Sequence, residues 1–191
     1  METFRQARPF VSHPDYKKAR NEALSGLQDE INKGSIYPPV LVLLKEFSTV
    51  PHCFTIQCCY GHFVHEKEPD DHNLAQLAPY AGIVRDVQYR IAYLALCIEN
   101  SYPGRELFQD LMQITIIDPD YIQFGSADWF WERNKNSYTI QVEPVRFMTQ
   151  DRAALDIMEA LYVENIRNRF FNMLAQVVRK HQNYFRPLSD E

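Results

Sequence analysis

The chain has 191 residues, 46% of them hydrophobic and 13% aromatic, and it carries a formal net charge of −5. This length and apolar content predict one folded domain with a large core, and they exclude a globally disordered chain. The acidic balance counts against a protein that binds nucleic acid through a broad basic face, because phosphate contacts made by Lys and Arg supply much of that affinity.

The first fifty residues indicate an arm and two helices. Residues 1–11 contain apolar side chains without a clear period and predict an N-terminal arm. The capping pattern Ser-His-Pro-Asp opens a helix over about 14–33, and Gly34 follows where a helix-ending glycine belongs. Two prolines then fit the start of a short buried helix from Pro38 to Phe47.

The middle of the chain indicates four strands and one helix. Apolar runs bounded by polar turns predict strands over 53–65 and 90–98. A helix is expected over 101–114. Two further strands, over 121–131 and 137–145, are joined by the turn sequence ERNKN and predict a hairpin.

A long helix is predicted at the C-terminal end, over residues 149–186. Thr149 and Asp151 suit its N-terminus, and apolar side chains follow at steps of three and four residues. A helix of roughly 35 residues is about 50 Å long, which is more than a domain of this size can cover. We therefore expect it either to break near Asn165 or to pack against a partner chain, and a homodimer through this helix is one prediction.

The element order α-α-β-β-α-β-β-α predicts a single α+β domain over residues 1–191, with helices packed on a mostly antiparallel sheet. The course of residues 66–88 is not defined by any pattern. No glycine-rich dinucleotide loop and no P-loop motif is present, so those two nucleotide-binding classes are excluded.

The sequence predicts a cytoplasmic protein with no membrane partner. No run approaches the roughly 18 apolar residues that a membrane helix needs, and the segment METFRQARPF lacks the apolar core of a secretory signal. Four cysteines in such a chain are expected to be reduced thiols.

The segment HCFTIQCCYGHFVHE, from His52 to Glu66, is the candidate site. It contains three of the four cysteines and three of the six histidines, side chains that bind metals, attack electrophiles and move protons near neutral pH. Gly61 would let a ligand approach the backbone closely. Because side chains alternate along a strand, the segment has a polar face and an apolar face. The polar face holds Cys53, Thr55, Gln57 and Cys59, and the apolar face holds Phe54, Ile56, Cys58 and Tyr60.

Three interpretations of these thiols and imidazoles remain open. Ordinary packing is the first. A tetrahedral zinc site from Cys53, Cys59, His62 and His65 is the second, although the familiar paired ligand spacings are absent and zinc is not favoured. A nucleophilic thiol at Cys59, paired with His62 or His52, is the third. The sequence does not show whether Cys59 and His62 are adjacent.

Three arginines flank predicted strand ends and are candidates for contacting an anion or a carboxylate. They are Arg90, Arg133 and Arg146. Taken singly, each is more typical of a surface ion pair.

Residues 33–63, KGSIYPPVLVLLKEFSTVPHCFTIQCCYGHF, resemble the family of tRNA wybutosine-synthesising methyltransferases. That family shows a K-G-S, a short apolar helix and a strand with an F-T-T-S-S-C-S-G-R type signature. A weaker likeness covers the predicted hairpin and the start of the last helix. The matching residues of the stronger stretch are Lys33, Gly34, Ser35, Phe54, Thr55, Cys59 and Gly61.

The resemblance implies a similar α+β fold, S-adenosylmethionine as cofactor, and methyl transfer to a nucleoside of RNA. We expect His62 to orient or deprotonate a substrate, with Cys59 beside it. The residues expected to bind an adenine-containing ligand or the nucleoside are Thr55, Gln57, Gly61, Arg90 and Arg146. The sequence departs from the family where Gln57 and Cys58 replace a serine pair, Tyr60 a small residue and His62 an arginine. The alternatives are a non-catalytic, dimeric or partner-binding protein, and a Cys/His metal-binding protein.

Overall fold

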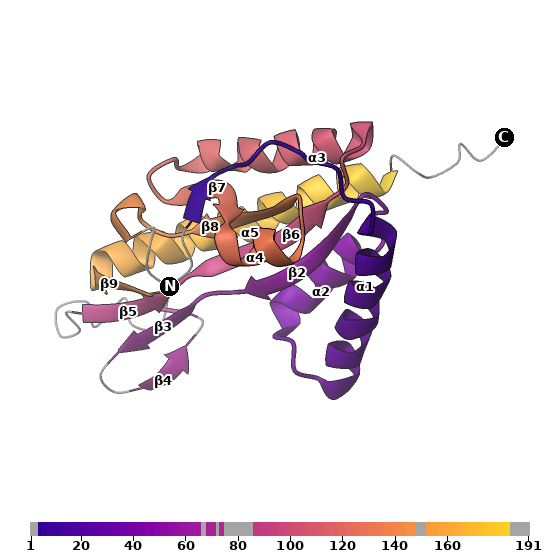
Figure 1. Cartoon of the computed structure of the whole chain (residues 1–191). Helices are drawn as coiled ribbons and strands as arrows, with labels where there is room; N and C mark the ends of the chain where they lie inside the picture. The colour runs from indigo at the N-terminus through magenta and orange to yellow at the C-terminus, as the bar shows by residue number, and fades with distance from the viewer. Residues whose placement is uncertain (1–3, 66–67, 72, 75–85, 148–151, 184–191) are drawn as a thin grey trace, which may run out of the picture.

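The computed structural model describes residues 4–65, 68–71, 73–74, 86–147 and 152–183. Within them the chain forms two antiparallel sheets and five helices (Figure 1). The predicted α+β fold, with antiparallel pairing and a long C-terminal helix, is confirmed. The strands are β1 (Phe4–Gln6), β2 (Cys53–Cys59), β3 (His62–His65), β4 (Glu68–Asp71), β5 (Asp86–Arg90), β6 (Ala92–Ile98), β7 (Ile122–Ala127), β8 (Ser137–Val142) and β9 (Arg152–Asp156). The helices are α1 (Tyr16–Lys33), α2 (Pro38–Ser48), α3 (Tyr102–Gln113), α4 (Asp128–Arg133) and α5 (Ile157–Asn183), with short 3-10 turns at Ile114–Ile117 and Val145–Phe147.

The first two helices end where their sequence signals indicate. Gly34 adopts a left-handed conformation with φ of 67°, and its N–H returns to the carbonyl groups of the last turn of α1. Pro38 occupies the first turn of α2, where a missing N–H leaves no bond unmade. The connection between them is therefore short and defined, which fixes the direction of α2 relative to α1.

Two segments of the chain pass from one sheet into the other. The five-stranded sheet has the order β1-β7-β8-β6-β2, and the four-stranded sheet has the order β4-β3-β5-β9. β2 leads into β3 through Tyr60 and Gly61, and β5 leads into β6 through Ile91. The single strand predicted over 53–65 is therefore two strands in different sheets, and the strand predicted over 90–98 begins at Ala92.

This corner is held by a glycine and a buried tyrosine. Gly61 has φ of 86°, and a Cβ there would lie 3.0 Å from the Cβ of Ala92 and 3.1 Å from Cε2 of Tyr89. The Tyr89 hydroxyl accepts a hydrogen bond from the Ala92 N–H at 2.9 Å and donates one to the Val142 carbonyl at 3.0 Å. Because both chain segments bend at the same point, side chains beyond Gly61 face a new direction.

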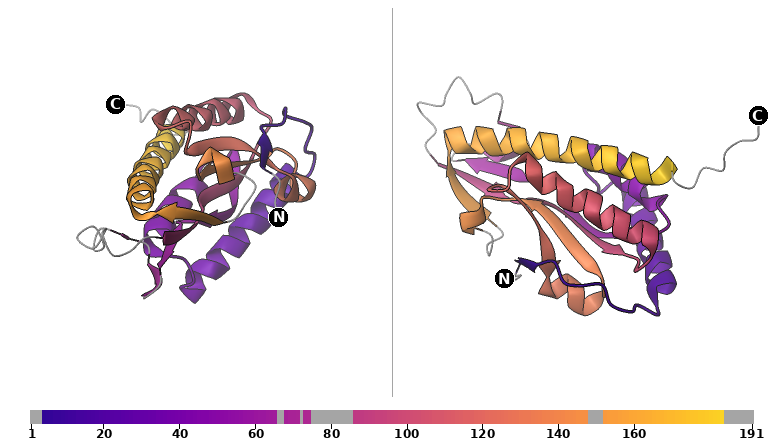
Figure 2. Two further views of the ribbon diagram at one scale, coloured as in Figure 1. Left: turned by 90° about the vertical axis from the view of Figure 1, so that its left-hand side faces the viewer. Right: turned by 90° about the horizontal axis from the view of Figure 1, so that it is seen from above.

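The five-stranded sheet has helices on both faces (Figures 1 and 2). Helices α2, α3 and α5 cover the face that carries Leu94, Leu96 and Ile98 of β6, and this layer contains the main core. The other face is covered less completely. There α1 packs through Tyr16 on Phe54 and Cys97, and α4 packs through Phe130 on Ala95 and Ala127.

The predicted hairpin over 121–145 contains a helix. β7 and β8 pair antiparallel as expected, with Ile122 opposite Val142. Residues 128–131, predicted as the end of a strand, and residues 132–133, predicted as part of the turn, instead form α4. Its Phe130 and Trp131 are both buried, which a short helix across the sheet end achieves with two adjacent residues and a strand would not.

The N-terminal arm adds an edge strand. β1 pairs with β7, with Phe4 opposite Ala127 and Gln6 opposite Gly125. A Cβ on Gly125 would lie 1.8 Å from the carbonyl oxygen of Arg5, so only glycine allows this close approach. The arm predicted over 1–11 is thus partly built into the sheet.

The last helix is shorter than predicted and packs on its own chain. Residues 152–156, predicted as helix, form β9, and α5 begins at Ile157. Ala153 and Leu155 are buried, and the residues on either side of each of them are exposed. This alternation has the two-residue period of a strand, which the longer helical pattern obscured. The apolar stripe, including Ile166 and Phe170, lies in the main core. None of the helices in the described part of the chain combines the length and apolar character that crossing a membrane requires.

Candidate functional site

A groove of about 1100 Å³ separates α1 from the second half of β2, and we call it the α1–β2 groove. One wall is α1, and the 34–38 connection closes one end. The floor is β2 from Phe54 to Cys59, with Tyr60 and His62 beyond it and Asn134 at the edge. The volume matches that of sites for drug-sized and cofactor-sized molecules. The predicted site residues Thr55, Gln57, Cys59 and His62 all line this groove.

Small side chains on α1 keep the groove open. Ala19 and Ala23 contact the cluster around Phe54, which brings the helix close to the strand at its N-terminal half. One turn further, Gly26 faces the groove, and a Cβ built on it meets no atom within 4 Å. The helix therefore diverges from β2 toward the Gly34 end, and Gly26 adds further space where the walls separate.

An irregularity in β2 decides which side chains face the groove. Thr55 is opposite Leu96 and Gln57 is opposite Ala95, so Ile56 is an extra residue in the ladder. Such a bulge reverses the alternation, and Phe54 and Cys58 pack in different clusters, contrary to the prediction that they share a face. Cys53 and Cys58 both pack with the main core instead.

Beyond the bulge, a polar row crosses the sheet from the groove. The register places Cys59 opposite Tyr93, Tyr93 opposite Gln141, and Gln141 opposite Gln123. The Gln141 amide donates to the buried carboxylate of Glu143 at 2.8 Å. Of this row only Cys59 lines the groove, and the two glutamines are buried and joined by a hydrogen bond from the Gln141 amide to Gln123 Oε1.

Three of the four thiols are poor nucleophiles because they are largely buried. Burial raises the pKa of Cys58 to about 12, with a smaller effect from Cys59, and burial also raises the pKa of Cys97 to about 12. Burial raises the pKa of Cys53 as well. Cys59 is only partly buried, and its Sγ accepts a hydrogen bond from the Gly61 N–H at 3.4 Å. Because it lines the groove and is less buried than Cys53 and Cys97, Cys59 stays the candidate thiol of this site.

Aromatic rings form the end of the groove where β2 leaves the sheet. The ring centroids of Tyr37 and Tyr60 are 5.2 Å apart, and those of Tyr60 and Phe171 are 4.7 Å apart. The guanidinium of Arg167, fully buried, lies 4.4 Å from the Tyr60 ring centroid and 5.2 Å from that of Phe63. These contacts fix Tyr60 as a flat surface on which a planar ring can stack.

Two of the predicted binding residues have other surroundings. The requirement for glycine at position 61 comes from its positive φ and from the close approach of Ala92, because Ala92 and Tyr89 fill the space predicted to admit a ligand. Arg146 forms an ion pair with Glu159 and lies 4.7 Å from the Phe147 ring centroid. Arg90 is opposite His62 in the four-stranded sheet, so the structure brings these two predicted residues together.

A zinc site is not assembled in the described part of the chain, where no group of three or more His, Cys, Asp and Glu side chains is arranged to hold a metal. Two of the proposed ligands are separated by the bulge, since Cys53 packs in the main core and Cys59 lines the groove. The four cysteines are also not joined by disulfides.

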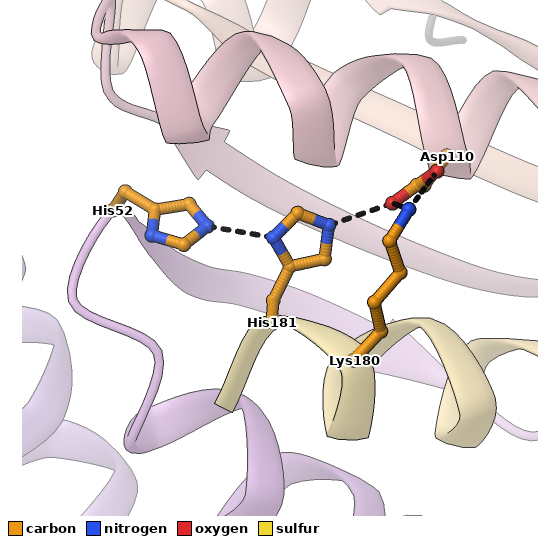
Figure 3. A network of polar contacts seen from close by, with 4 residues as sticks. All are labelled: His52, Asp110, Lys180 and His181. Atoms are coloured by element: carbon orange, nitrogen blue, oxygen red, sulfur yellow. Dashed lines mark hydrogen bonds and ion pairs between the residues drawn. The ribbon is translucent and has the colours of Figure 1, made fainter. Parts of the chain in front are cut away.

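A second constellation joins His52, His181, Asp110 and Lys180 between α3, α5 and the start of β2 (Figure 3). His52 Nε2 is 3.2 Å from His181 Nδ1, and His181 Nε2 is 2.8 Å from Asp110 Oδ2. Lys180 Nζ donates to both oxygens of the same carboxylate, at 2.7 and 2.8 Å. An ionised carboxylate only accepts, so His181 Nε2 carries the proton and, in the neutral ring, His52 Nε2–H donates to His181 Nδ1.

The surroundings of His52 favour its neutral form. Burial, then His181 and Arg20, lower the pKa of His52 to about 4. Burial alone would raise the pKa of Asp110, but hydrogen bonds from Lys180 and His181 more than offset it, and the pKa lies below its usual value. Both imidazoles are at most 1% exposed, so a substrate cannot reach them. The arrangement of Asp, His and His therefore ties the end of α5 to α3 and β2.

Comparison with known proteins identifies related folds only. No family model and no curated protein matches the chain. One structure of the PH1069 protein from Pyrococcus horikoshii OT3 is similar with a TM-score of 0.55 and 15% identity, covering 91% of this chain and 97% of that one. A second PH1069 structure gives a TM-score of 0.50 at 14% identity, covering 88% and 93%. The similarity extends over nearly the whole of both chains, and at this identity it shows the fold.

Several residues of both constellations carry no signal in the sequence. Gly26 lies inside a helix, where glycine lowers helix propensity, but this says nothing about a groove beside it. Tyr37 and Arg167 are far in the sequence from Tyr60, and Asp110 is far from His181. Only the packing of the helices brings each of them to its partner. An arginine within an apolar helical stripe is the one pattern that could have indicated Arg167.

Proposed function

We propose that the α1–β2 groove binds S-adenosylmethionine and that the protein transfers its methyl group to a nucleoside of RNA, as a diverged methyltransferase of the cytoplasm. The observation that carries this proposal is the position of the residues shared with the wybutosine-synthesising methyltransferases. Five of the seven, Gly34, Ser35, Phe54, Thr55 and Cys59, line the groove. Shared residues that line one cavity support a shared ligand better than shared residues scattered over the molecule would.

The chemistry of the lining suits an adenine-containing molecule. Tyr60, held by Arg167 and Phe171, offers a stacking surface for the base. Glu22 and Glu30 on α1 both line the same space. Both oxygens of Glu30 already accept hydrogen bonds, from Lys33 and Ser35, so Glu22 is the carboxylate that would accept hydrogen bonds from ribose hydroxyls or from an amino group. Gln57 on the floor can both donate and accept.

The bound donor would supply an electrophilic methyl group. His62 lies at the end of the groove, where a nucleoside would have to enter, and its imidazole can accept the proton that the attacking nitrogen or oxygen loses. Cys59, held by the Gly61 N–H, lies on the floor nearby and would contribute to positioning. In this proposal the donor binds along α1, and the proton is accepted by His62 at the corner after Gly61.

Filling the groove from α1 tests the proposal. A Cβ at position 26 meets no atom within 4 Å, so Gly26→Trp starts an indole in open space at the groove, whereas Gly26→Ala adds one methyl group there. We expect isothermal titration to show saturable binding of S-adenosylmethionine to the wild type and to Gly26→Ala, and a loss of at least about tenfold in affinity for Gly26→Trp. Thermal unfolding of both variants provides the control that the fold is intact.

Two results would overturn the assignment. The first is the absence of saturable binding to the wild type at millimolar S-adenosylmethionine. The second is binding that Gly26→Trp leaves unchanged, which would place the ligand elsewhere on the molecule.

A further inference from the structure

A row of three basic side chains crosses the outer face of the four-stranded sheet. The register places His62 of β3 opposite Arg90 of β5, and Arg90 opposite Arg152 of β9. The neighbouring row, Phe63, Tyr89 and Ala153, is at most 1% exposed and belongs to the main core. Because side chains alternate along each strand, the basic row projects away from the core, and Arg90 and Arg152 are exposed.

The register places side chains of like charge opposite one another. Residues directly opposite in an antiparallel pair have Cβ atoms about 4.5–5.5 Å apart, and like charges there are destabilising. At the far end of the same two strands, Asp86 is opposite Asp156. Basic and acidic side chains are therefore separated along β5 and β9, and a polyanion would meet the basic end, beside the groove.

The row begins at the groove. His62 lines the α1–β2 groove, and Arg90 and Arg152 extend from it by one and two strands, a distance of about 10 Å at the usual strand spacing. Arg152 makes no ion pair within the described residues, where many other arginines and lysines do, for example Arg146 with Glu159 and Arg179 with Glu46. A chain of phosphates that delivers a base to the groove would pass over this row.

We propose that His62, Arg90 and Arg152 bind successive phosphates of an RNA strand whose nucleoside enters the α1–β2 groove. The choice of RNA as the polyanion rests on the proposed function. The basic row is an observation from the strand register and does not depend on that function. A local row of this kind lets a chain with net charge −5 contact a phosphate backbone without a broad basic face.

Charge reversal at Arg152 separates binding from stability. Arg152→Glu places a carboxylate opposite Arg90, so we expect equal or higher thermal stability together with weaker RNA binding. Fluorescence anisotropy with a labelled RNA hairpin should show at least about a tenfold decrease in affinity. The slope of log affinity against log salt should become shallower by about 0.7–0.9 for each phosphate that the variant no longer binds. Arg152→Lys should retain most of the affinity.

Lys17→Glu is the matched control, because it changes the net charge equally at an exposed position on α1 outside the groove lining. Equal decreases of RNA affinity in Lys17→Glu and Arg152→Glu would overturn the proposal, as would a wild type that does not bind the hairpin. Titration of S-adenosylmethionine into the same variants distinguishes the sources of the anion. A parallel decrease of its affinity in Arg152→Glu would assign the row to the donor's carboxylate and overturn the phosphate assignment. RNA binding through the row without any binding of S-adenosylmethionine would support this proposal and contradict the methyl-donor assignment alone.

Discussion

At the scale of single residues, His52 shows how burial converts an ordinary imidazole into a pH-dependent contribution to stability. Its ring is 1% exposed and donates to His181, which in turn donates to Asp110 (Figure 3). The pKa of His52 is about 4 in the folded protein and near 6.5 in an unfolded chain. Between these values the unfolded chain binds a proton that the folded protein does not, so the free energy of unfolding falls as the pH falls from 6.5 toward 4.

We predict that this residue accounts for a loss on the order of 3 kcal/mol across that window, at 1.36 kcal/mol per pKa unit. Urea unfolding at about pH 7.5 and about pH 5 should show roughly 2 kcal/mol of this loss, because the rest develops between pH 5 and pH 4. His52→Gln retains a donor toward His181 but does not titrate, so its stability should depend less steeply on pH. His13→Gln, at a histidine outside the network, should follow the wild type. A slope that is the same in His52→Gln and in the wild type would show that other groups carry the pH dependence.

At the scale of elements, replacing glycine by alanine should have opposite effects on stability at two positions. One is Gly61, at the corner between β2 and β3, and the other is Gly26, on the open side of α1. Gly61→Ala forces a side chain into a left-handed backbone and against Ala92, and we expect a loss of about 2 kcal/mol or more. Gly26→Ala adds a good helix former in open space, and we expect a gain of up to about 1 kcal/mol.

Thermal unfolding measures both shifts, at roughly 2–4 °C per kcal/mol for a chain of this size. A neutral Gly61→Ala would contradict the role of a positive φ and of Ala92 in fixing the corner. It would also reopen the space beside Gly61 as a place for a ligand.

At the scale of the whole molecule, local signals predict elements, and long-range packing decides their junctions. The end of α1 at Gly34 and the starts of α2 and α3 at their prolines follow local signals, because these signals act within one turn of the helix ends. The predicted cap at Ser12 is wrong: α1 begins at Tyr16, after Asp15, and no side chain of the described residues caps it. The corner at Gly61, the bulge at Ile56 and the change from β9 to α5 depend on partners far along the chain. The thiols and histidines of residues 52–66 indicated a candidate site, and the groove that its residues line is bounded by α1. The α1 wall and Arg167 were not predicted, since nothing near them in the sequence marks the approach of α1 or α5.

α5 contacts both sheets, and the burial of its side chains decides which of its faces could form a dimer. Phe170 is fully buried, whereas Met158 is 66% exposed on the same helix. Phe170→Glu places an unpaired carboxylate in the main core, so we expect it to abolish cooperative unfolding, while Met158→Glu should change the free energy of unfolding by no more than about 0.5 kcal/mol. Urea unfolding and sedimentation of both variants check this. A folded Phe170→Glu protein with an altered molecular mass would instead restore the stripe as an interface between two copies. A change of mass in Met158→Glu alone would place any such interface on the exposed side of α5.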